Sequence, residues 1–242
     1  MSESVVLDTA LRLPAPDVEA LIEGRMIAAL PKIFLDPGRQ FALYPADASI
    51  NLMPAERQYR PNFLPTAQTT FASLGSEIVW IKAWARCELC QILNESESLE
   101  ALSRLTIWTT ETLQQILLRQ PCIFLAYLRV YLLPQPIEVP IHTQERQFVP
   151  LPRSVSVTES LSVLSDRIFT QRRRQLEKLE PPLHPELEEL QSAIAQLNNP
   201  SAQQLAGKIS QFLGWTSQTP AQLADPKLDW IKDIVVLGDR SK

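Results

Sequence analysis

The chain has 242 residues, of which 45% are hydrophobic and 21% are charged, and its formal net charge is -4. This composition is typical of a globular protein that can bury a sizeable core. The acidic balance argues against bulk electrostatic binding to nucleic acid or to an anionic membrane. The three cysteines do not make a disulfide framework, and no apolar run reaches the roughly 18 residues of a membrane span. We therefore expect a cytoplasmic protein without a membrane-spanning segment.

The first elements of the chain predict an α+β domain. Residues 15–24 indicate a short helix that starts near Asp17 and ends at Gly24. Residues 25–35 and 39–45 predict a β-hairpin, because the Asp-Pro-Gly between them suits a type II turn.

The middle of the chain predicts a loop, two strands and two helices. Residues 46–75 are polar and aperiodic, so we expect a long loop there. Strands are expected at residues 77–93 and 122–133, which are rich in β-branched and aromatic side chains. Between these strands, helices are expected over residues 98–105 and 111–119, and a preceding threonine would cap the second helix.

The sequence changes character beyond the second of these strands. Residues 134–152 are extended and rich in proline, and from Ser156 a Ser-Val-Thr-Glu capping box predicts a helix of about 22 residues. Further amphipathic helices are expected toward the C-terminus. The predicted fold class is α+β, with a mainly antiparallel sheet and short helices in residues 1–152 and a helical region in residues 153–242.

Alternate residues of the two predicted strands form one apolar face and one face that mixes aromatic rings with cations. We name the second of these the outer face, which comprises Trp80, Lys82, Trp84, Arg86, Tyr127, Arg129 and Tyr131. We interpret it as a half-exposed surface on which arginine stacks against rings, and residues after 156 should cover it if its role is structural. The alternative is a nucleic-acid platform, on which bases stack and cations meet phosphates.

Two further sets of side chains could form sites. Candidate phosphate contacts on one stripe of a predicted helix are Arg167, Arg174 and Lys178. Such a stripe is more often a solvated helix face. A zinc set could be drawn from Cys87, Cys90, Cys122 and His142. Because residues three apart in a strand point to opposite faces, Cys87 and Cys90 should diverge, and we expect buried structural cysteines instead.

Motifs for catalysis are missing from the sequence. The six glycines form no GxG, GxxxxGK[ST] or GxSxG pattern, so neither a phosphate-cradling loop nor a nucleophilic-serine turn is indicated. The triplet from Asp225 to Lys227 has the (D/E)-x-K form of a nuclease site but lacks a Pro-Asp pair at a suitable distance upstream. We therefore predict no catalytic residue, no metal and no cofactor, and keep an enzyme as the residual alternative.

Three segments carry a resemblance to a known family. They are FALYP at 41–45, IWT at 107–109 and LRVYLLPQP at 128–136. In this order they resemble a bacterial family known as domain of unknown function 1802, over about residues 20–145. The resemblance implies an occasional association with restriction-type nuclease domains, although no such domain is found in this sequence. The helical tail looks like a cyanobacterial elaboration of the family.

The missing catalytic sets and a leucine and isoleucine stripe at residues 187–197 favour a non-enzymatic binding or scaffold protein. We expect its C-terminal helices to engage a protein partner or a second copy of the chain. The alternative is a nucleic-acid-binding module that uses the outer face, linked to restriction-type DNA transactions.

Overall fold

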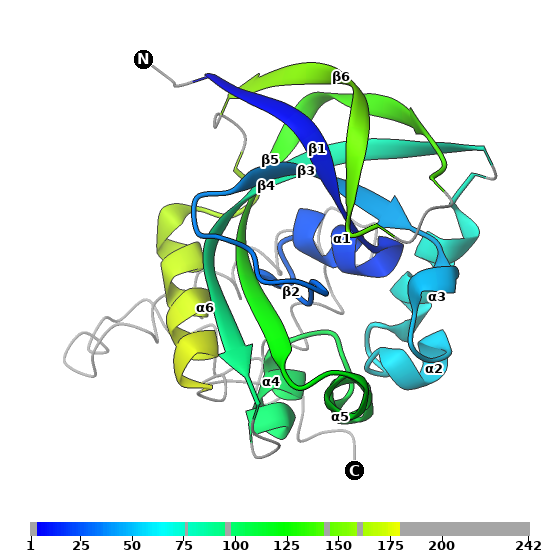
Figure 1. Cartoon of the computed structure of the whole chain (residues 1–242). Helices are drawn as coiled ribbons and strands as arrows, with labels where there is room; N and C mark the ends of the chain where they lie inside the picture. The colour runs from blue at the N-terminus through cyan, green and yellow to red at the C-terminus, as the bar shows by residue number, and fades with distance from the viewer. Residues whose placement is uncertain (1–3, 76, 95–97, 143–145, 159–161, 180–242) are drawn as a thin grey trace, which may run out of the picture. The chain divides into compact units, whose positions relative to one another are not determined.

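A six-stranded sheet runs through the part of the chain that the structure describes (Figure 1). The structure is a computed structural model and describes residues 4–75, 77–94, 98–142, 146–158 and 162–179. The strands are β1 (Ser4–Pro14), β2 (Ala28–Ala29), β3 (Gln40–Ala46), β4 (Ile78–Leu93), β5 (Ile123–Pro140) and β6 (Phe148–Thr158). They lie in the order β2-β5-β4-β3-β1-β6. The helices predicted beyond residue 179 lie outside the described residues.

The sheet is mixed. β1 and β3 are parallel neighbours, whereas the other four neighbouring pairs are antiparallel. A parallel pair needs a crossover connection, and helix α1 (Ala15–Ile22) begins the connection here. The prediction of a sheet with short helices is confirmed. The parallel pair is a feature that the sequence patterns did not predict.

Short helices surround the sheet. The other helices of the described residues are α2 (Ala55–Gln58), α3 (Leu64–Ala72), α4 (Leu99–Leu105), α5 (Thr110–Arg119), α6 (Asp166–Lys178) and the 3-10 helix η1 (Ala48–Ile50). The two helices predicted between β4 and β5 are confirmed as α4 and α5. The Thr109 hydroxyl caps α5 by accepting a hydrogen bond from the Thr112 amide at 3.2 Å. Within this part of the chain, no helix is long and apolar enough to cross a membrane.

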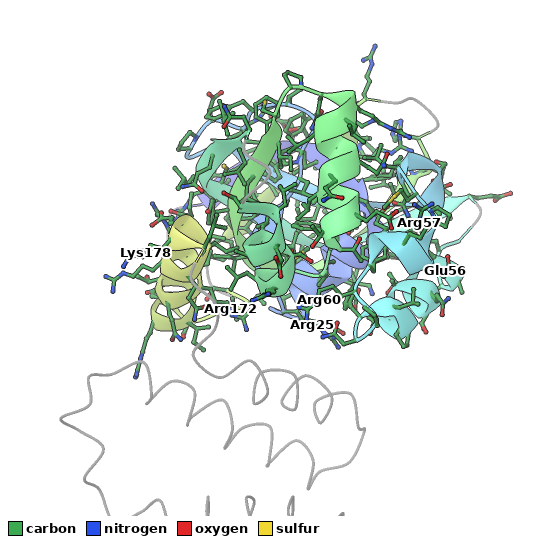
Figure 2. All side chains as sticks on the ribbon, turned by 90° about the horizontal axis from the view of Figure 1, so that it is seen from below. Arg25, Glu56, Arg57, Arg60, Arg172 and Lys178 are labelled. Atoms are coloured by element: carbon green, nitrogen blue, oxygen red, sulfur yellow. The ribbon has the colours of Figure 1, made fainter. Side chains whose placement is uncertain are left out.

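Helix α1 ends at the predicted glycine. Gly24 has a left-handed φ of +66°, which favours glycine just beyond a helix. A Cβ at this position would lie 2.8 Å from the Leu164 side chain, so glycine also lets the segment before α6 approach α1. The Gly24 carbonyl accepts a hydrogen bond from Arg172 of α6, which Figure 2 labels. These contacts hold α6 against the end of α1.

The predicted β-hairpin is wrong. β2 pairs with β5, and β3 lies between β1 and β4, so the two segments do not pair with each other. The turn between them does form, because Gly38 has a φ of +86° and the Arg39 amide donates to the Asp36 carbonyl at 3.1 Å. A turn signal of this kind predicts a local reversal of the chain but does not identify the strands that pair.

The long loop predicted at residues 46–75 is also wrong, because this segment contains η1, α2 and α3. Pro54 is the N-cap residue of α2, and Pro65 lies in the first turn of α3. Proline is tolerated at these positions because the first backbone amides of a helix have no intrahelical partner. These prolines therefore begin helices, although the pattern suggested a loop.

Strand β6 replaces the start of the predicted C-terminal helix. Ser156, the expected helix cap, lies in β6 and is paired with Val6 of β1. The predicted boundary between residues 152 and 153 falls inside this strand. The prolines of β6 are compatible with its place at the edge of the sheet. Helix α6 begins after Ser165, and the compact unit that holds all these elements spans Met1–Pro182.

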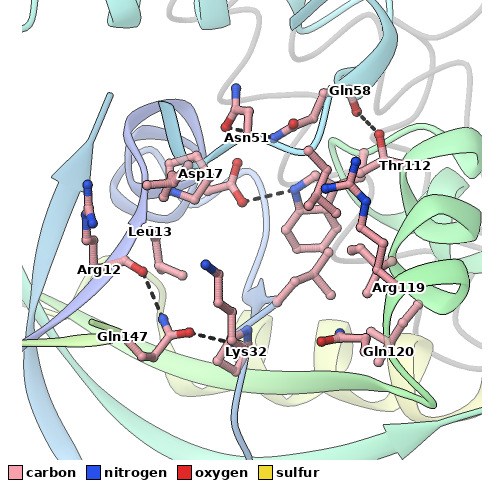
Figure 3. A pocket seen from close by; sticks show the side chains of 18 of the residues that line it. Arg12, Leu13, Asp17, Lys32, Asn51, Gln58, Thr112, Arg119, Gln120 and Gln147 are labelled. Atoms are coloured by element: carbon pink, nitrogen blue, oxygen red, sulfur yellow. Dashed lines mark hydrogen bonds between the residues drawn. The ribbon is translucent and has the colours of Figure 1, made fainter. Parts of the chain in front are cut away.

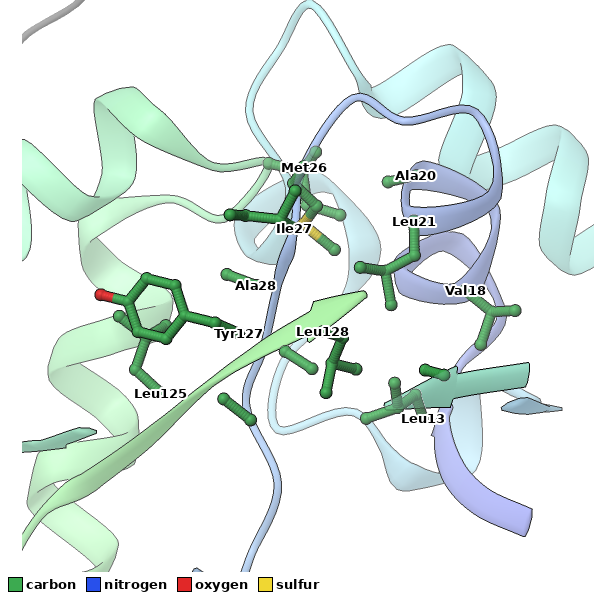
Figure 4. Packing of buried hydrophobic residues seen from close by; sticks show 14 of the residues in the cluster. Leu13, Val18, Ala20, Leu21, Met26, Ile27, Ala28, Leu125, Tyr127 and Leu128 are labelled. Atoms are coloured by element: carbon green, nitrogen blue, oxygen red, sulfur yellow. The ribbon is translucent and has the colours of Figure 1, made fainter. Parts of the chain in front are cut away.

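Both faces of the sheet are buried. Phe41 and Leu43 of β3 belong to one apolar cluster, whereas Ala42 and Tyr44, which alternate with them along the same strand, belong to a second. Figure 4 shows part of the first cluster, in which Val18 and Leu21 of α1 lie against the strands. The expectation of one core face and one half-exposed face is therefore corrected.

The second cluster contains the centre of the outer face. The Trp84 ring is fully buried and stacks on Tyr131, with the ring centroids 4.3 Å apart and the planes 14° from parallel. Val149 and Val157 of β6 belong to the same cluster, and Ser162 forms an isolated bridge with Tyr131. Strand β6 and the segment after it therefore contribute to the cover over these two rings.

Replacing Trp84 by alanine should lower the free energy of unfolding by roughly 3 to 5 kcal/mol, because it leaves a large cavity in this cluster. The matched control is Trp80→Ala on the same strand, since Trp80 is 52% exposed. Chemical denaturation of the two variants measures the difference. Equal, small losses for both would show that Trp84 is not packed as described.

Candidate functional site

A pocket of about 200 Å³ opens between β1, α1 and α5 (Figure 3). Its apolar lining residues are Leu13, Pro14, Leu30, Pro31, Ile50, Leu52, Ile116 and Ile123. Its other lining residues are Arg12, Asp17, Lys32, Asn51, Gln58, Trp108, Thr112, Arg119, Gln120, Arg146 and Gln147. The fold thus gathers the lining from segments that are far apart in the sequence. Concave, largely apolar sites with a few polar groups are typical of small-molecule binding.

The carboxyl of Asp17 lies in the lining and is only 3% exposed. The Tyr59 hydroxyl donates a hydrogen bond to its Oδ1 at 2.9 Å, and the Trp108 indole donates to its Oδ2 at 3.0 Å. Tyr59 and Trp108 are themselves joined by an isolated β-bridge. Backbone pairing between the segments that follow α2 and precede α5 therefore aims both donors at the first turn of α1.

Burial raises the pKa of Asp17 from 3.8 to about 7, while the hydrogen bonds from Tyr59 and Trp108 act in the opposite direction. The carboxyl can therefore gain or lose a proton near neutral pH. Burial and the nearby Asp17 charge raise the pKa of Tyr59, so this hydroxyl stays protonated and remains a donor.

Two side-chain amides extend this hydrogen-bonded chain. Gln58 Nε2 donates to the Tyr59 hydroxyl oxygen at 3.1 Å and to Asn51 Oδ1 at 3.3 Å. Gln58 Oε1 and Asn51 Nδ2 are buried atoms that have no hydrogen-bond partner among the described residues. Buried polar atoms usually have a partner, so these two atoms leave an acceptor and a donor for another group.

Four cationic side chains line the pocket from separate segments: Arg12, Lys32, Arg119 and Arg146. Asp17 is the single acidic residue in the described lining. Gln147 connects two of these segments, because its side chain donates to the Arg12 carbonyl at 2.9 Å and accepts from the Lys32 amide at 2.6 Å. The charge of the lining therefore favours an anionic ligand.

The structure separates the predicted outer face into different environments. Trp80 and Lys82 are exposed, whereas Trp84, Tyr127 and Tyr131 are buried. They do not form one contiguous exposed surface for base stacking. Rings that stack on bases must be accessible, and the described part of the chain covers three of the four rings in this set.

The remaining cations of the outer face have acidic partners. Arg129 is 8% exposed, forms an ion pair with Asp166 of α6 and lies over the Phe169 ring at 4.9 Å. Arg86 forms an ion pair with Glu88 at 2.8 Å. Helix α6 therefore covers Arg129 of β5 and supplies both its carboxylate partner, Asp166, and the ring beneath it, Phe169.

A second, more polar hollow brings several predicted residues together. Its volume is about 460 Å³, and its lining includes Arg86, Arg129, Tyr131 and Arg174 together with Glu88, Asp166 and Glu177. Arg167 and Lys178, the other candidate phosphate contacts, are exposed on α6 but do not line it. Figure 2 shows Lys178 at the surface of this helix. The acids among the lining offset much of its positive charge.

The two cysteines of β4 lie on the same side of the strand, which corrects the prediction that they diverge. The register shifts between Cys87 and Leu89, so that Cys87 and Cys90 face Leu128 and Ala126 of β5 and join one cluster. Burial raises the pKa of Cys87 to about 12, so the thiol stays protonated. The described residues contain no group of three or more histidine, cysteine, aspartate or glutamate side chains that could hold a metal.

Two features of the sequence explain why the pocket was not predicted from it. An acid in the first turn of a helix is usually an exposed residue that favours the helix N-terminus, so Asp17 gave no sign of burial. The four cations come from four separate segments and form no local cluster. One signal did exist, because the IWT segment supplies the Trp108 donor and the Thr109 cap of α5.

Comparisons with known proteins identify one family. The family model described as "Domain of unknown function (DUF1802)" matches residues 10–175, which include every described residue of the pocket lining. Neither the curated proteins nor the solved structures contain a match to the chain.

Asp17→Asn should change how stability depends on pH. The folded protein keeps a proton on Asp17 up to about pH 7, whereas in the unfolded chain the carboxyl has its ordinary pKa of 3.8. The resulting stabilisation is full below pH 3.8 and is lost as the pH rises toward 7. Asparagine mimics the protonated group, so from pH 5 to pH 8 the variant should gain roughly 2 to 3 kcal/mol relative to the native chain.

Urea denaturation at pH 5 and pH 8 measures this change, and Asp36→Asn, which removes an exposed carboxylate, provides the comparison. A difference between the Asp17 variant and the native chain that stays constant with pH would show that Asp17 is solvated.

Proposed function

The chain belongs to the family described as "Domain of unknown function (DUF1802)", and we propose that it is a binding protein for a small organic anion. The ligand occupies the pocket between β1, α1 and α5. This proposal keeps the expectation of a non-enzymatic binding protein and assigns the binding to a defined site.

The charge of the pocket is the observation that carries this proposal. Among the described lining residues, four are cationic and come from β1, the segment after β2, α5 and the segment before β6, whereas Asp17 is the single acid. Charge of one sign in a concave site raises the local concentration of ligands of the opposite sign. A carboxylate or a phosphate group suits this arrangement.

The apolar walls indicate that the ligand also has an organic body. Eight aliphatic or proline side chains line the pocket, so an inorganic ion alone would leave most of the lining without a contact. Trp108 adds an aromatic side chain, although its indole is committed to Asp17. A ligand that combines an anionic group with an apolar body matches both parts of the lining.

The described pocket offers little for chemical catalysis. Both oxygens of Asp17 accept hydrogen bonds, from Tyr59 and Trp108. The hydroxyl of Thr112 donates to the Gln58 carbonyl at 2.9 Å, so it is held by the backbone. Binding without turnover is therefore the simpler function for this set of residues.

Engagement of a protein partner or a second copy by the C-terminal helices is a separate proposal. It rests on the apolar stripe at residues 187–197, which lies outside the described residues. The chain would then combine a ligand-binding domain with a partner-binding region.

Phenyl phosphate tests the pocket, because it joins a compact ring to one anionic group. It should bind the full chain more tightly than inorganic phosphate in isothermal titration calorimetry. The double change Arg119→Ala and Arg146→Ala should weaken this binding about tenfold, since each exposed charge pair contributes roughly 0.5 to 1 kcal/mol.

Lys82→Ala is the control, because Lys82 is exposed on β4 and does not line the pocket. Its affinity for phenyl phosphate should equal that of the native chain. Binding that is absent from the native chain, or unchanged by the double arginine variant, would contradict the proposal.

A further inference from the structure

Two side-chain amides in the pocket each have a buried atom that makes no hydrogen bond within the described residues. Gln58 is only 5% exposed, and its Oε1 has no hydrogen-bond partner among the described residues. Asn51 Nδ2 is likewise without one. Both residues line the pocket. A buried acceptor and a buried donor lower the stability of the fold unless a group in the pocket forms hydrogen bonds with them.

The orientation of the Gln58 amide follows from the direction of the hydrogen bonds. The Tyr59 hydroxyl uses its proton on Asp17, so its oxygen can accept from Gln58. Gln58 must therefore turn its NH₂ group toward Tyr59 and Asn51, which leaves Oε1 as the free atom. Because Asn51 Oδ1 accepts from Gln58, its own NH₂ group is the free donor.

This acceptor and donor lie at one end of the pocket, and Lys32 lies at the other. Figure 3 shows Asn51 and Gln58 at one end of the view and Lys32 and Gln147 at the opposite end, with Asp17 and Leu13 between them. A complementary ligand therefore has a polar edge at one end and its anionic group at the other.

We infer that the pocket takes a nucleotide, with an edge of the base on Asn51 and Gln58 and the phosphate toward Lys32. The inference rests on the proposed binding of an organic anion. One edge of a base presents both an N–H donor and an acceptor, which are the partners that Gln58 Oε1 and Asn51 Nδ2 lack. The flat ring occupies the middle of the pocket, and the phosphate reaches Lys32 at the opposite end.

Binding of nucleoside monophosphates tests the inference against ribose 5-phosphate, which has the sugar and phosphate but no base. Titration calorimetry of the full chain with AMP, GMP, CMP and UMP should show at least one that binds tenfold or more tightly than ribose 5-phosphate. Gln58→Met should remove this preference while leaving the affinity for ribose 5-phosphate unchanged. Lys32→Ala should weaken both kinds of ligand by the same factor.

Asn51→Leu is the second variant, because Asn51 is half-buried and its loss is less disruptive to folding than a change at Gln58. A thermal melt confirms that each variant is folded. Equal affinities of the native chain for ribose 5-phosphate and for all four nucleotides would overturn the inference, because water then satisfies the amides, but would leave the proposed anion binding intact. A base preference that survives both amide variants would also overturn it. Failure of phenyl phosphate, ribose 5-phosphate and the nucleotides alike would overturn both proposals.

Discussion

The buried carboxyl of Asp17 is the contact on which the pocket depends. It accepts hydrogen bonds from Tyr59 and Trp108, and so joins the first turn of α1 to the segments that follow α2 and precede α5. Gln58 at the end of α2 and Thr112 in the first turn of α5 adjoin these segments and belong to the same lining. Loss of the carboxyl would leave a buried hydroxyl and a buried indole without their acceptor, which is costly inside a protein. The position of the pocket walls thus follows from one polar contact.

Opposing effects set the protonation state of the Asp17 carboxyl. Burial favours the neutral carboxylic acid, whereas the two donors favour the carboxylate. The Gln58 side-chain amide donates a hydrogen bond to the Tyr59 hydroxyl oxygen and so helps to hold this donor in place. A ligand that places an anionic group among the cations of the lining also adds negative charge to the pocket. Such a ligand favours the protonated form of Asp17, so binding and proton uptake are expected to be linked.

Local patterns predicted the strands at β4 and β5 and the helices α1, α4 and α5 well, because periodicity, caps and Gly24 act within a few residues. Pairing of β1 with β3 and of β6 with β1 depends on contacts between distant segments, and no local signal encodes it. The prediction placed Trp84 on the same face as Trp80, but the register shift between Ile81 and Ala83 brings it into the cluster of Val79 and Ile81, where the distant strand β6 helps to bury it. The burial of Asp17 could not be predicted for the same reason, because it depends on Tyr59 and Trp108, which lie far from Asp17 in the sequence.

A carbon-13 NMR titration of the Asp17 carboxyl in the full chain tests this account most directly. The signal is assigned by its loss in the Asp17→Asn variant. The account predicts a midpoint near pH 7, since the carboxyl is buried beneath Tyr59 and Trp108. A midpoint near the ordinary value of 3.8 would mean that the carboxyl is open to solvent, and would contradict the pocket described here.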